Sequence, residues 1–98
     1  MRIAFIRVST EQQNIDRQWD RLESISDELY IERVSAVSKH RPVYDKVIKR
    51  LKKHDTLVVL DLDRVWRSTI DALTEVEKLQ KRGIELEIVN LSVDTKTP

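Results

Sequence analysis

Short apolar runs alternate with segments of helical periodicity along the whole chain. Apolar and β-branched residues cluster over 3–6, 29–34, 56–60 and 84–89, and these runs predict strands. Between the strands, apolar residues recur every three or four positions and predict three helices. The predicted buried faces of these helices are Ile15, Trp19, Leu22 and Ile25; Val43, Val47, Ile48 and Leu51; and Ile70, Leu73, Val76 and Leu79. This order of elements predicts an α/β fold with a mainly parallel sheet of four to five strands flanked by helices.

Residues that favour helix ends lie at the borders of the predicted helices. A capping-box pattern opens at Thr10 and predicts the start of the first helix. Pro42 suits the first turn of the second helix, and Ser68 with Asp71 opens the third. Gly83, the only glycine of the chain, follows the third helix, where a left-handed cap is expected.

The composition is that of one small domain. The chain has 98 residues, 40% of them hydrophobic, which is enough for a single modest core. Its 18 Lys and Arg against 17 Asp and Glu leave a net charge of +1, so bulk charge predicts no strong non-specific attraction to nucleic acid or anionic lipid. The absence of cysteine excludes disulfides and thiolate metal sites. No apolar run approaches the roughly 20 residues that span a bilayer, and we expect a soluble, cytoplasmic protein that binds no membrane. Residues 91–98 are predicted to be a tail.

Three polar segments follow predicted strands, and such segments gather at one edge of a parallel sheet. They cover residues 7–9, 35–41 and 61–67. Together they hold the hydroxyl of Ser9, the carboxylate of Asp63 and four guanidinium groups, those of Arg7, Arg41, Arg64 and Arg67. Arg64 and Arg67 are three residues apart, so a helical turn would bring them to one side.

This set of side chains suits chemistry at a phosphate. Guanidinium groups bind phosphate oxygens in pairs and stabilise the negative charge that gathers when a phosphoryl centre is attacked. We therefore interpret Ser9 as a nucleophile and Asp63 as a proton donor or orienting group. Each residue alone has a more ordinary interpretation, since serine before a helix is usually an N-cap and a lone arginine is usually solvated. Trp19 is predicted to lie in the core, and Trp66 is predicted to have a packing role.

Two motifs resemble those of a known family. Arg7-Val8-Ser9-Thr10, followed by Gln13 and Gln18, resembles the opening motif of the serine recombinases of the resolvase/invertase family. Leu62-Asp63-Arg64-Val65-Trp66-Arg67 resembles the second signature of that family, and Ser35 and Arg41 fall at the expected places between the motifs. Order and spacing match over essentially the whole chain. The resemblance implies the resolvase catalytic-domain architecture, which is flavodoxin-like.

The resemblance also implies an activity and a role for each motif residue. Such an enzyme recombines double-stranded DNA at specific sites by cleaving, exchanging and rejoining strands. Ser9 would form a phosphoserine bond to a DNA 5′ end and release a 3′ hydroxyl. The family pattern implies that the scissile phosphate is bound by Arg7, Arg41, Arg64 and Arg67, with Asp63 near the leaving oxygen and Gln13, Gln18 and Ser35 in support. The covalent link conserves bond energy, so the resemblance implies neither a metal nor a nucleotide cofactor.

Two features depart from the family pattern. Ala36 and Trp66 stand where the family usually has glycine, and a tryptophan there would restrict motion of the loop or serve a subunit contact. In the family, a long dimerisation helix and a DNA-binding domain follow the region of 94–98. We therefore expect residues 1–98 to be the catalytic domain alone, inactive in recombination by itself, with dimers and tetramers formed by the full-length protein.

Two alternatives remain open. The run from Leu57 to Leu60 ends in Asp61-Leu62-Asp63, which resembles the Mg²⁺-dependent phosphatases of haloacid dehalogenase type. That family expects a further acidic pair, and the next predicted strand ends in Val89-Asn90-Leu91 without one. A second alternative is an inactive relative of the recombinases that acts as a binding module.

Overall fold

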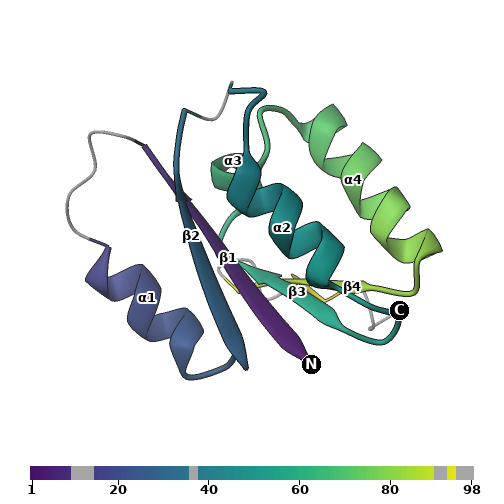
Figure 1. Cartoon of the computed structure of the whole chain (residues 1–98), viewed down its shortest axis with the longest axis horizontal. Coiled ribbons are helices and arrows are strands. Elements are labelled where there is room, and N and C mark those ends of the chain that lie inside the picture. Colours follow the sequence, from purple (N-terminus) through teal and green to yellow (C-terminus); the bar gives the residue numbers. More distant parts are fainter. Residues whose placement is uncertain (10–14, 36–37, 90–92, 95–98) are drawn as a thin grey trace.

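A five-stranded sheet forms the middle layer of the molecule, in the strand order β2-β1-β3-β4-β5 (Figure 1). The computed structural model describes residues 1–9, 15–35, 38–89 and 93–94. The strands are β1 (Arg2–Val8), β2 (Glu28–Arg33), β3 (Thr56–Val59), β4 (Glu85–Ile88) and β5 (Val93–Asp94). The first four are parallel, and β5 pairs antiparallel with β4. The predicted fold class is therefore confirmed, whereas the prediction of a plain tail was wrong at residues 93–94, which extend the sheet.

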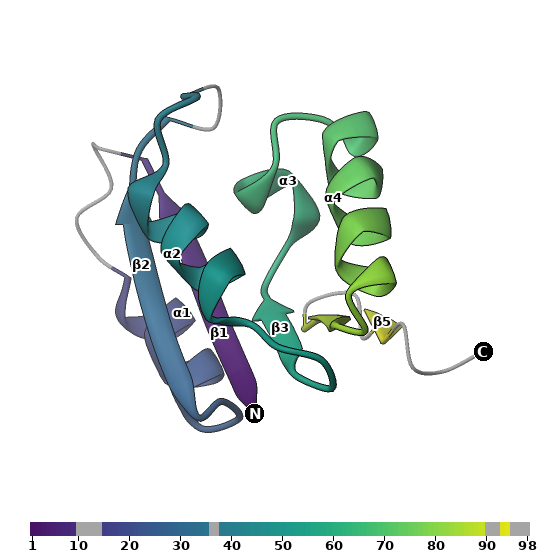
Figure 2. The same ribbon diagram turned by 45° about the vertical axis from the view of Figure 1, so that its right-hand side comes forward.

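Helices cover both faces of the sheet. Helix α1 (Asp16–Glu23) lies on one face, behind β1 and β2 in Figure 2, and α2 (Pro42–Arg50) lies in front of them. Helices α3 (Leu62–Val65) and α4 (Thr69–Lys81) share the face of α2. In β1, Ile3 and Phe5 pack in the cluster on this face, while Ala4, Ile6 and Val8 pack with Leu22 of α1 on the other. Side chains thus alternate between two cores, as expected of a strand that is covered on both sides.

The buried face of α4 differs from the predicted one. Ile70 and Leu73 were predicted to be buried, but 76% and 60% of their surfaces are exposed. Ala72 and Leu79 are buried instead, with Val76 packed beside them. These three residues follow a four- and three-residue spacing, and the small side chain of Ala72 forms the contact that we had assigned to larger ones. The helix is therefore rotated relative to the prediction.

Trp19 is the second correction in the core. It is half-buried, and its indole N–H donates a hydrogen bond to Glu23 Oε2 at 2.7 Å on the surface of α1. Helix α1 packs mainly on β1 and β2, near one edge of the sheet, and Leu22 is its one fully buried residue. A helix in this position buries a narrow stripe, and Trp19 lies at the margin of that stripe.

The helix ends follow local sequence chemistry. The Ser68 side chain accepts a hydrogen bond from the backbone N–H of Asp71 at 3.2 Å, and Pro42 occupies the first turn of α2. Gly83 has φ +78°, the left-handed conformation expected after a helix. These three predictions are confirmed. The capping box that opens at Thr10 lies outside the described residues, and α1 begins at Asp16.

Within the described residues, no helix is long and apolar enough to span a membrane.

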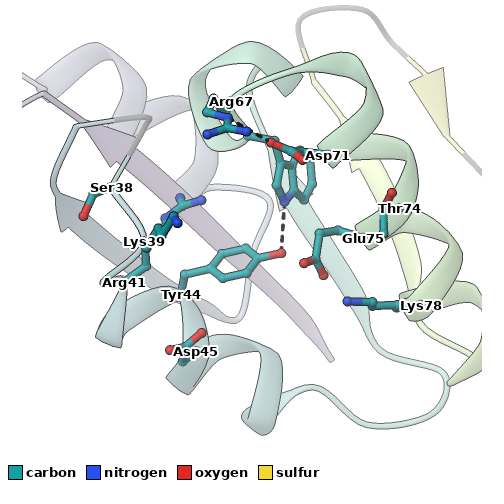
Figure 3. A pocket seen from close by; sticks show the side chains of 11 residues that line it. Ser38, Lys39, Arg41, Tyr44, Asp45, Arg67, Asp71, Thr74, Glu75 and Lys78 are labelled. Carbon is teal, nitrogen blue, oxygen red and sulfur yellow. Dashed lines mark hydrogen bonds and ion pairs between the residues drawn. The ribbon is translucent and has the colours of Figure 1, made fainter.

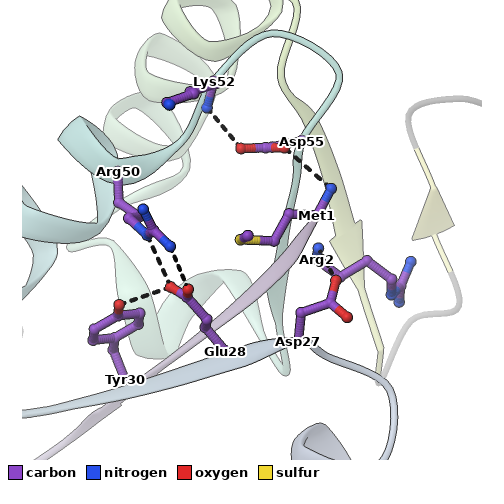
Figure 4. A network of polar contacts seen from close by, with 8 residues as sticks. All are labelled: Met1, Arg2, Asp27, Glu28, Tyr30, Arg50, Lys52 and Asp55. Carbon is purple, nitrogen blue, oxygen red and sulfur yellow. Dashed lines mark hydrogen bonds and ion pairs between the residues drawn. The ribbon is translucent and has the colours of Figure 1, made fainter.

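A network of polar contacts ties the elements together where β2 begins (Figure 4). Glu28 of β2 accepts hydrogen bonds from Arg50 Nη2 at 2.6 Å, Arg50 Nε at 3.1 Å and the Tyr30 hydroxyl at 2.8 Å. The hydrogen bonds from Arg50, followed by that from Tyr30, lower the pKa of Glu28 from 4.5 to about 2. This carboxylate therefore joins β2 to the end of α2 in its ionised form.

We expect Glu28→Gln to remove part of the acid sensitivity of the fold. Because the pKa of Glu28 is lowered on folding, its contribution to stability is complete above pH 4.5 and is lost as the pH falls towards 2. Urea unfolding at a series of acidic pH values should show wild type approaching the stability of Glu28→Gln as the pH falls. The exposed Glu77 of α4 provides the control substitution, Glu77→Gln. A constant difference between wild type and Glu28→Gln from neutral pH to pH 2 would contradict this account.

Candidate active site

The ends of neighbouring parallel strands bring the predicted site segments together. β1 pairs with both β2 and β3, and Arg7 lies opposite Glu32 in the register of β1 and β2. Ser9 follows the end of β1 and is exposed, and Ser35 is exposed beyond the end of β2. Both strands end at the upper edge of the sheet in Figure 1, where α3 also lies. The nucleophile candidate Ser9 is thus accessible at the edge where the three segments converge.

Arg7 and Gln18 approach one another at this edge from different elements. Arg7 is half-buried, and its Nη1 donates a hydrogen bond to the backbone oxygen of Val34 at 2.8 Å. Arg7, Gln18 and Asp61 line one small cavity between β1, α1 and the segment after β3. The amide oxygen of Gln18 is buried there and accepts no hydrogen bond from any residue that the structure describes. Two of the predicted site residues, Arg7 and Gln18, are therefore neighbours.

Arg41 is held by aromatic rings at the start of α2. Its Cζ atom lies 4.6 Å from the ring centre of Tyr44 and 5.7 Å from that of Phe5. Only 12% of the side chain is exposed, and its Nε is 3.7 Å from Glu32 Oε1. Within the described part of the chain, Nε and one terminal nitrogen, Nη2, are buried without a hydrogen-bond partner. Buried donors are nearly always satisfied in folded proteins, so this guanidinium is suited to bind an anion.

Glu32 fixes both Arg41 and the helix that follows it. Its side chain is 3% exposed and accepts hydrogen bonds from the backbone N–H groups of Val43 at 2.8 Å and Tyr44 at 3.2 Å. These donors lie in the first turn of α2, where backbone N–H groups have no partner within the helix. Glu32 therefore takes the place of an N-cap side chain, since Arg41 at the N-cap position makes no such bond.

The segment after β3 contains a short helix that the sequence did not predict. Residues 62–65 form α3, and Trp66 ends it in an extended conformation with φ −115° and ψ 152°. Arg67 therefore lies beyond the helix, so the helical turn that would bring Arg64 and Arg67 to one side does not extend to Arg67. The Arg67 side chain is 59% exposed, with its Nε 3.5 Å from Asp71 Oδ2. The side chains of Asp63 and Arg64 lie outside the described part of the structure, as does the whole of Gln13.

A groove of about 460 Å³ opens between α2 and α4 beside Arg41 (Figure 3). Tyr44 and Trp66 contribute to its lining, and the Arg67 and Asp71 side chains point towards one another at its rim. Charges of both signs line the groove: Lys39, Arg41, Arg67 and Lys78 on one hand, and Asp45, Asp71 and Glu75 on the other. The groove is therefore polar, and its lining includes Arg41 and Arg67, two candidates for phosphate binding.

Tyr44 is a buried titratable group in this groove. Burial raises the pKa of its hydroxyl from 10.0 to about 12, although the hydrogen bond from Trp66 acts in the opposite direction. That bond joins Trp66 Nε1 to the Tyr44 hydroxyl oxygen at 3.0 Å, and it is the dashed line at Tyr44 in Figure 3. Trp66 is 3% exposed, so its predicted packing role is confirmed.

We expect the fold to lose stability in alkali through Tyr44. The free energy of unfolding is unaffected by this group below pH 10 and falls as the pH rises from 10 towards 12. It falls because the Tyr44 hydroxyl of the unfolded state releases its proton more readily than that of the folded state. A pKa difference of this size corresponds to about 3 kcal/mol. Urea unfolding of wild type and Tyr44→Phe should therefore show a difference that changes over this range, and the tyrosinate absorbance of Tyr44→Phe should lack a late step. Equal alkaline profiles for the two proteins would refute the assignment.

Comparisons with known proteins identify the family of this chain. The family description "Resolvase, N terminal domain" matches residues 2–98. The DNA-invertase of Escherichia phage P1 is 42% identical over 99 residues, which cover 100% of this chain and 53% of the relative. The serine recombinase gin of Escherichia phage Mu is 37% identical over 99 residues, covering 100% of this chain and 51% of the relative. The chain belongs to the resolvase/invertase family of serine recombinases.

The fold of this serine recombinase domain is shared with solved structures. A resolvase family site-specific recombinase from Streptococcus pneumoniae superposes with a TM-score of 0.74 over 99% of this chain and 76% of that chain, at 15% identity. At this identity the likeness shows the fold alone. The chain spans about half the length of the curated relatives that it matches.

Two residues of the candidate site were missed by sequence reasoning. Glu32 was placed in a strand without a role, although a carboxylate at an inward-facing strand position is an unusual feature that marks such a site. Tyr44 stands three, four and seven residues before Val47, Ile48 and Leu51, so helical spacing could have placed it on the buried face of α2. The contacts of Glu32 and Tyr44 with Arg41 are visible only in the tertiary structure.

Proposed function

We propose that this chain is the catalytic domain of an enzyme that recombines double-stranded DNA at specific sites through Ser9. The Ser9 hydroxyl oxygen attacks a backbone phosphorus and forms a phosphoserine bond to the 5′ side, while the bond to the 3′ oxygen breaks. Ser9 loses its proton to water or a neighbouring base, and the departing 3′ oxygen gains one to become a hydroxyl. One phosphodiester replaces another, so a 3′ hydroxyl from a second strand can reverse the step and rejoin the DNA. The site would act in the cytoplasm, where this substrate lies.

The observation that carries the proposal is the state of Arg41. A guanidinium is buried against two aromatic rings, and its Nε and Nη2 lack hydrogen-bond partners among the described residues. Such a group binds a phosphate more strongly when charge develops on the phosphate oxygens, and this difference accelerates the reaction. Glu32 neutralises part of the charge and fixes the position of Arg41 without forming the close, two-pronged pair that would occupy it.

The other predicted residues have proposed roles around the same phosphate. Arg7 and Arg67 approach from β1 and from the segment before α4. The Val34 carbonyl, which Arg7 contacts, and the Asp71 carboxylate, which Arg67 contacts, are groups that a phosphate can replace. Gln18 lies beside Arg7 and supports it. By resemblance to the family motif, further phosphate contacts, leaving-group protonation and support are assigned to Arg64, Asp63, Gln13 and Ser35.

The proposed partners follow from the relatives. Because this chain spans about half of the phage P1 DNA-invertase, we propose that recombination needs further parts that hold DNA and join subunits into dimers and tetramers. The test therefore uses a chimaera in which residues 1–98 replace the matching half of that invertase. Its substrate is end-labelled DNA containing the recombination site of the invertase.

The test is the formation of a covalent protein–DNA adduct in excess EDTA, detected on a denaturing gel. A labelled band that is destroyed by protease and carries a 5′ phosphoserine on peptide analysis supports the proposal. No band in EDTA, together with phosphatase activity that needs Mg²⁺ and is lost in Asp61→Asn, would favour the haloacid dehalogenase alternative. DNA binding without either activity would favour an inactive binding module.

A further inference from the structure

One buried hydrogen bond links the two segments that carry site arginines. Trp66 lies at the end of α3, directly before Arg67, and Tyr44 lies in the first turn of α2, three residues after Arg41. The indole Nε1 donates to the Tyr44 hydroxyl oxygen at 3.0 Å, and both residues are buried. The two rings meet edge to face, with centres 6.4 Å apart and planes at 88°. The contact therefore fixes the distance and the relative rotation of the two segments.

The same tyrosine ring packs against the guanidinium group of Arg41. Its centre is 4.6 Å from Arg41 Cζ, and it packs edge to face on Phe5 of β1 with the ring centres 5.5 Å apart. The ring is thus held by Trp66 at its hydroxyl and by Phe5 at its edge, while its face is turned to the guanidinium. A rotation of the ring would break the bond to Trp66 or withdraw the face from Arg41. The orientation of Arg41 therefore depends on a residue 25 positions further along the chain.

We propose that Tyr44 and Trp66 are positioning residues that hold Arg41 at the orientation needed for attack on the phosphate. The inference rests on the proposed function, since it concerns the phosphate contact of that reaction. Neither residue needs to touch DNA, because Trp66 acts through Tyr44 and Tyr44 acts through Arg41. The pair also couples the segment after β3 to the start of α2, so that Arg67 and Arg41 keep a fixed relation.

The test compares conservative variants that remove the bond and keep the aromatic packing. Tyr44→Phe removes the acceptor oxygen, and Trp66→Phe removes the donor. Trp19→Phe and Tyr30→Phe are matched controls, since they remove a tryptophan–Glu23 bond and a tyrosine–Glu28 bond away from the site. All are made in the chimaera and assayed at a temperature at which each variant is fully folded. The first-order rate of adduct formation is measured at saturating DNA, and DNA affinity is measured separately.

We expect Tyr44→Phe and Trp66→Phe each to slow adduct formation by roughly 10- to 100-fold, because small misplacements of a catalytic group have effects of this size. DNA affinity should stay within about twofold, and the controls should cleave like wild type. The double variant should be no slower than the slower single variant, because both single changes remove the same bond. Unchanged rates in both variants, or slowing that multiplies in the double variant, would overturn the inference.

A second readout in residues 1–98 alone separates this inference from the proposed function. The N–H resonance of Arg41 Nε senses the ring currents of Tyr44 and Phe5, and burial protects it from hydrogen exchange. In Tyr44→Phe and Trp66→Phe we expect the resonance to shift and its exchange to speed up, with no change in Trp19→Phe. An unchanged resonance overturns the positioning role even if wild-type chimaera cleaves DNA. Absence of an adduct from the wild-type chimaera overturns the proposed function, and with it the catalytic part of this inference, whatever the resonance shows.

Discussion

Ser9→Ala is expected to abolish the covalent protein–DNA adduct while leaving the fold intact. The proposed reaction has no other nucleophile, so removing the hydroxyl oxygen removes the atom that forms the bond to phosphorus. Ser9 is exposed beyond the end of β1. Surface substitutions of this kind change stability by no more than about 0.5 kcal/mol, so the variant should unfold at the urea concentration of wild type.

The matched control for this substitution is Ser24→Ala. Ser24 is an exposed serine at the end of α1, and its hydroxyl donates only a long bond of 3.4 Å to the Arg21 carbonyl. The chimaera carrying Ser24→Ala should form adduct at the wild-type rate. An adduct of undiminished yield in Ser9→Ala, mapped to another residue, would assign the nucleophile elsewhere and reduce Ser9 to its ordinary role near a helix.

Arg41→Ala is expected to slow adduct formation by roughly 10²- to 10³-fold, the usual effect of removing one preorganised donor from a developing oxyanion. Arg41→Lys should restore little of the rate, because an ammonium group lacks the planar fork that contacts two phosphate oxygens. Single-turnover rates at saturating DNA are the measurement, since they separate the chemical step from binding.

The stability of Arg41→Ala has to be measured beside its rate. Glu32 keeps its two backbone hydrogen bonds when Arg41 is removed, so the start of α2 should remain formed. Arg50→Ala is the control, because Arg50 pairs with Glu28 at the amino-terminal end of β2. That variant should be less stable in urea and should cleave at the wild-type rate. Equal rates for Arg41→Ala and wild type would place the phosphate elsewhere.

The fold could be predicted from the sequence wherever one local pattern decided the structure. The β-branched run at 56–60 is typical of a buried strand, and Gly83 marked the end of α4 because glycine tolerates positive φ. The face of α4 was misjudged because Ile70 and Leu73 have the same spacing as the residues that are buried. Periodicity gives the repeat of a helix, while the neighbouring elements determine its rotation.

The motifs of the sequence nominate residues for the candidate site, but they do not predict how those residues are arranged. Motif order identified Ser9, Arg7 and Arg41, since the chemistry of these side chains is visible in the sequence. The surroundings of Arg41 could not be predicted, because Tyr44 contacts it from a helix and Glu32 contacts it from a strand. Long-range contacts of this kind leave no spacing signal.

The bond between Trp66 and Tyr44 also constrains how this chain can evolve. Replacing Tyr44 alone leaves the buried indole N–H of Trp66 without a hydrogen-bond acceptor. Replacing Trp66 alone leaves the Tyr44 hydroxyl without its donor, beside a cavity. Each single step crosses a less fit intermediate, although the exchange of both residues ends in a satisfied core. The two positions should therefore covary: descendants of this chain should retain tyrosine at 44 and tryptophan at 66 together or lose them together.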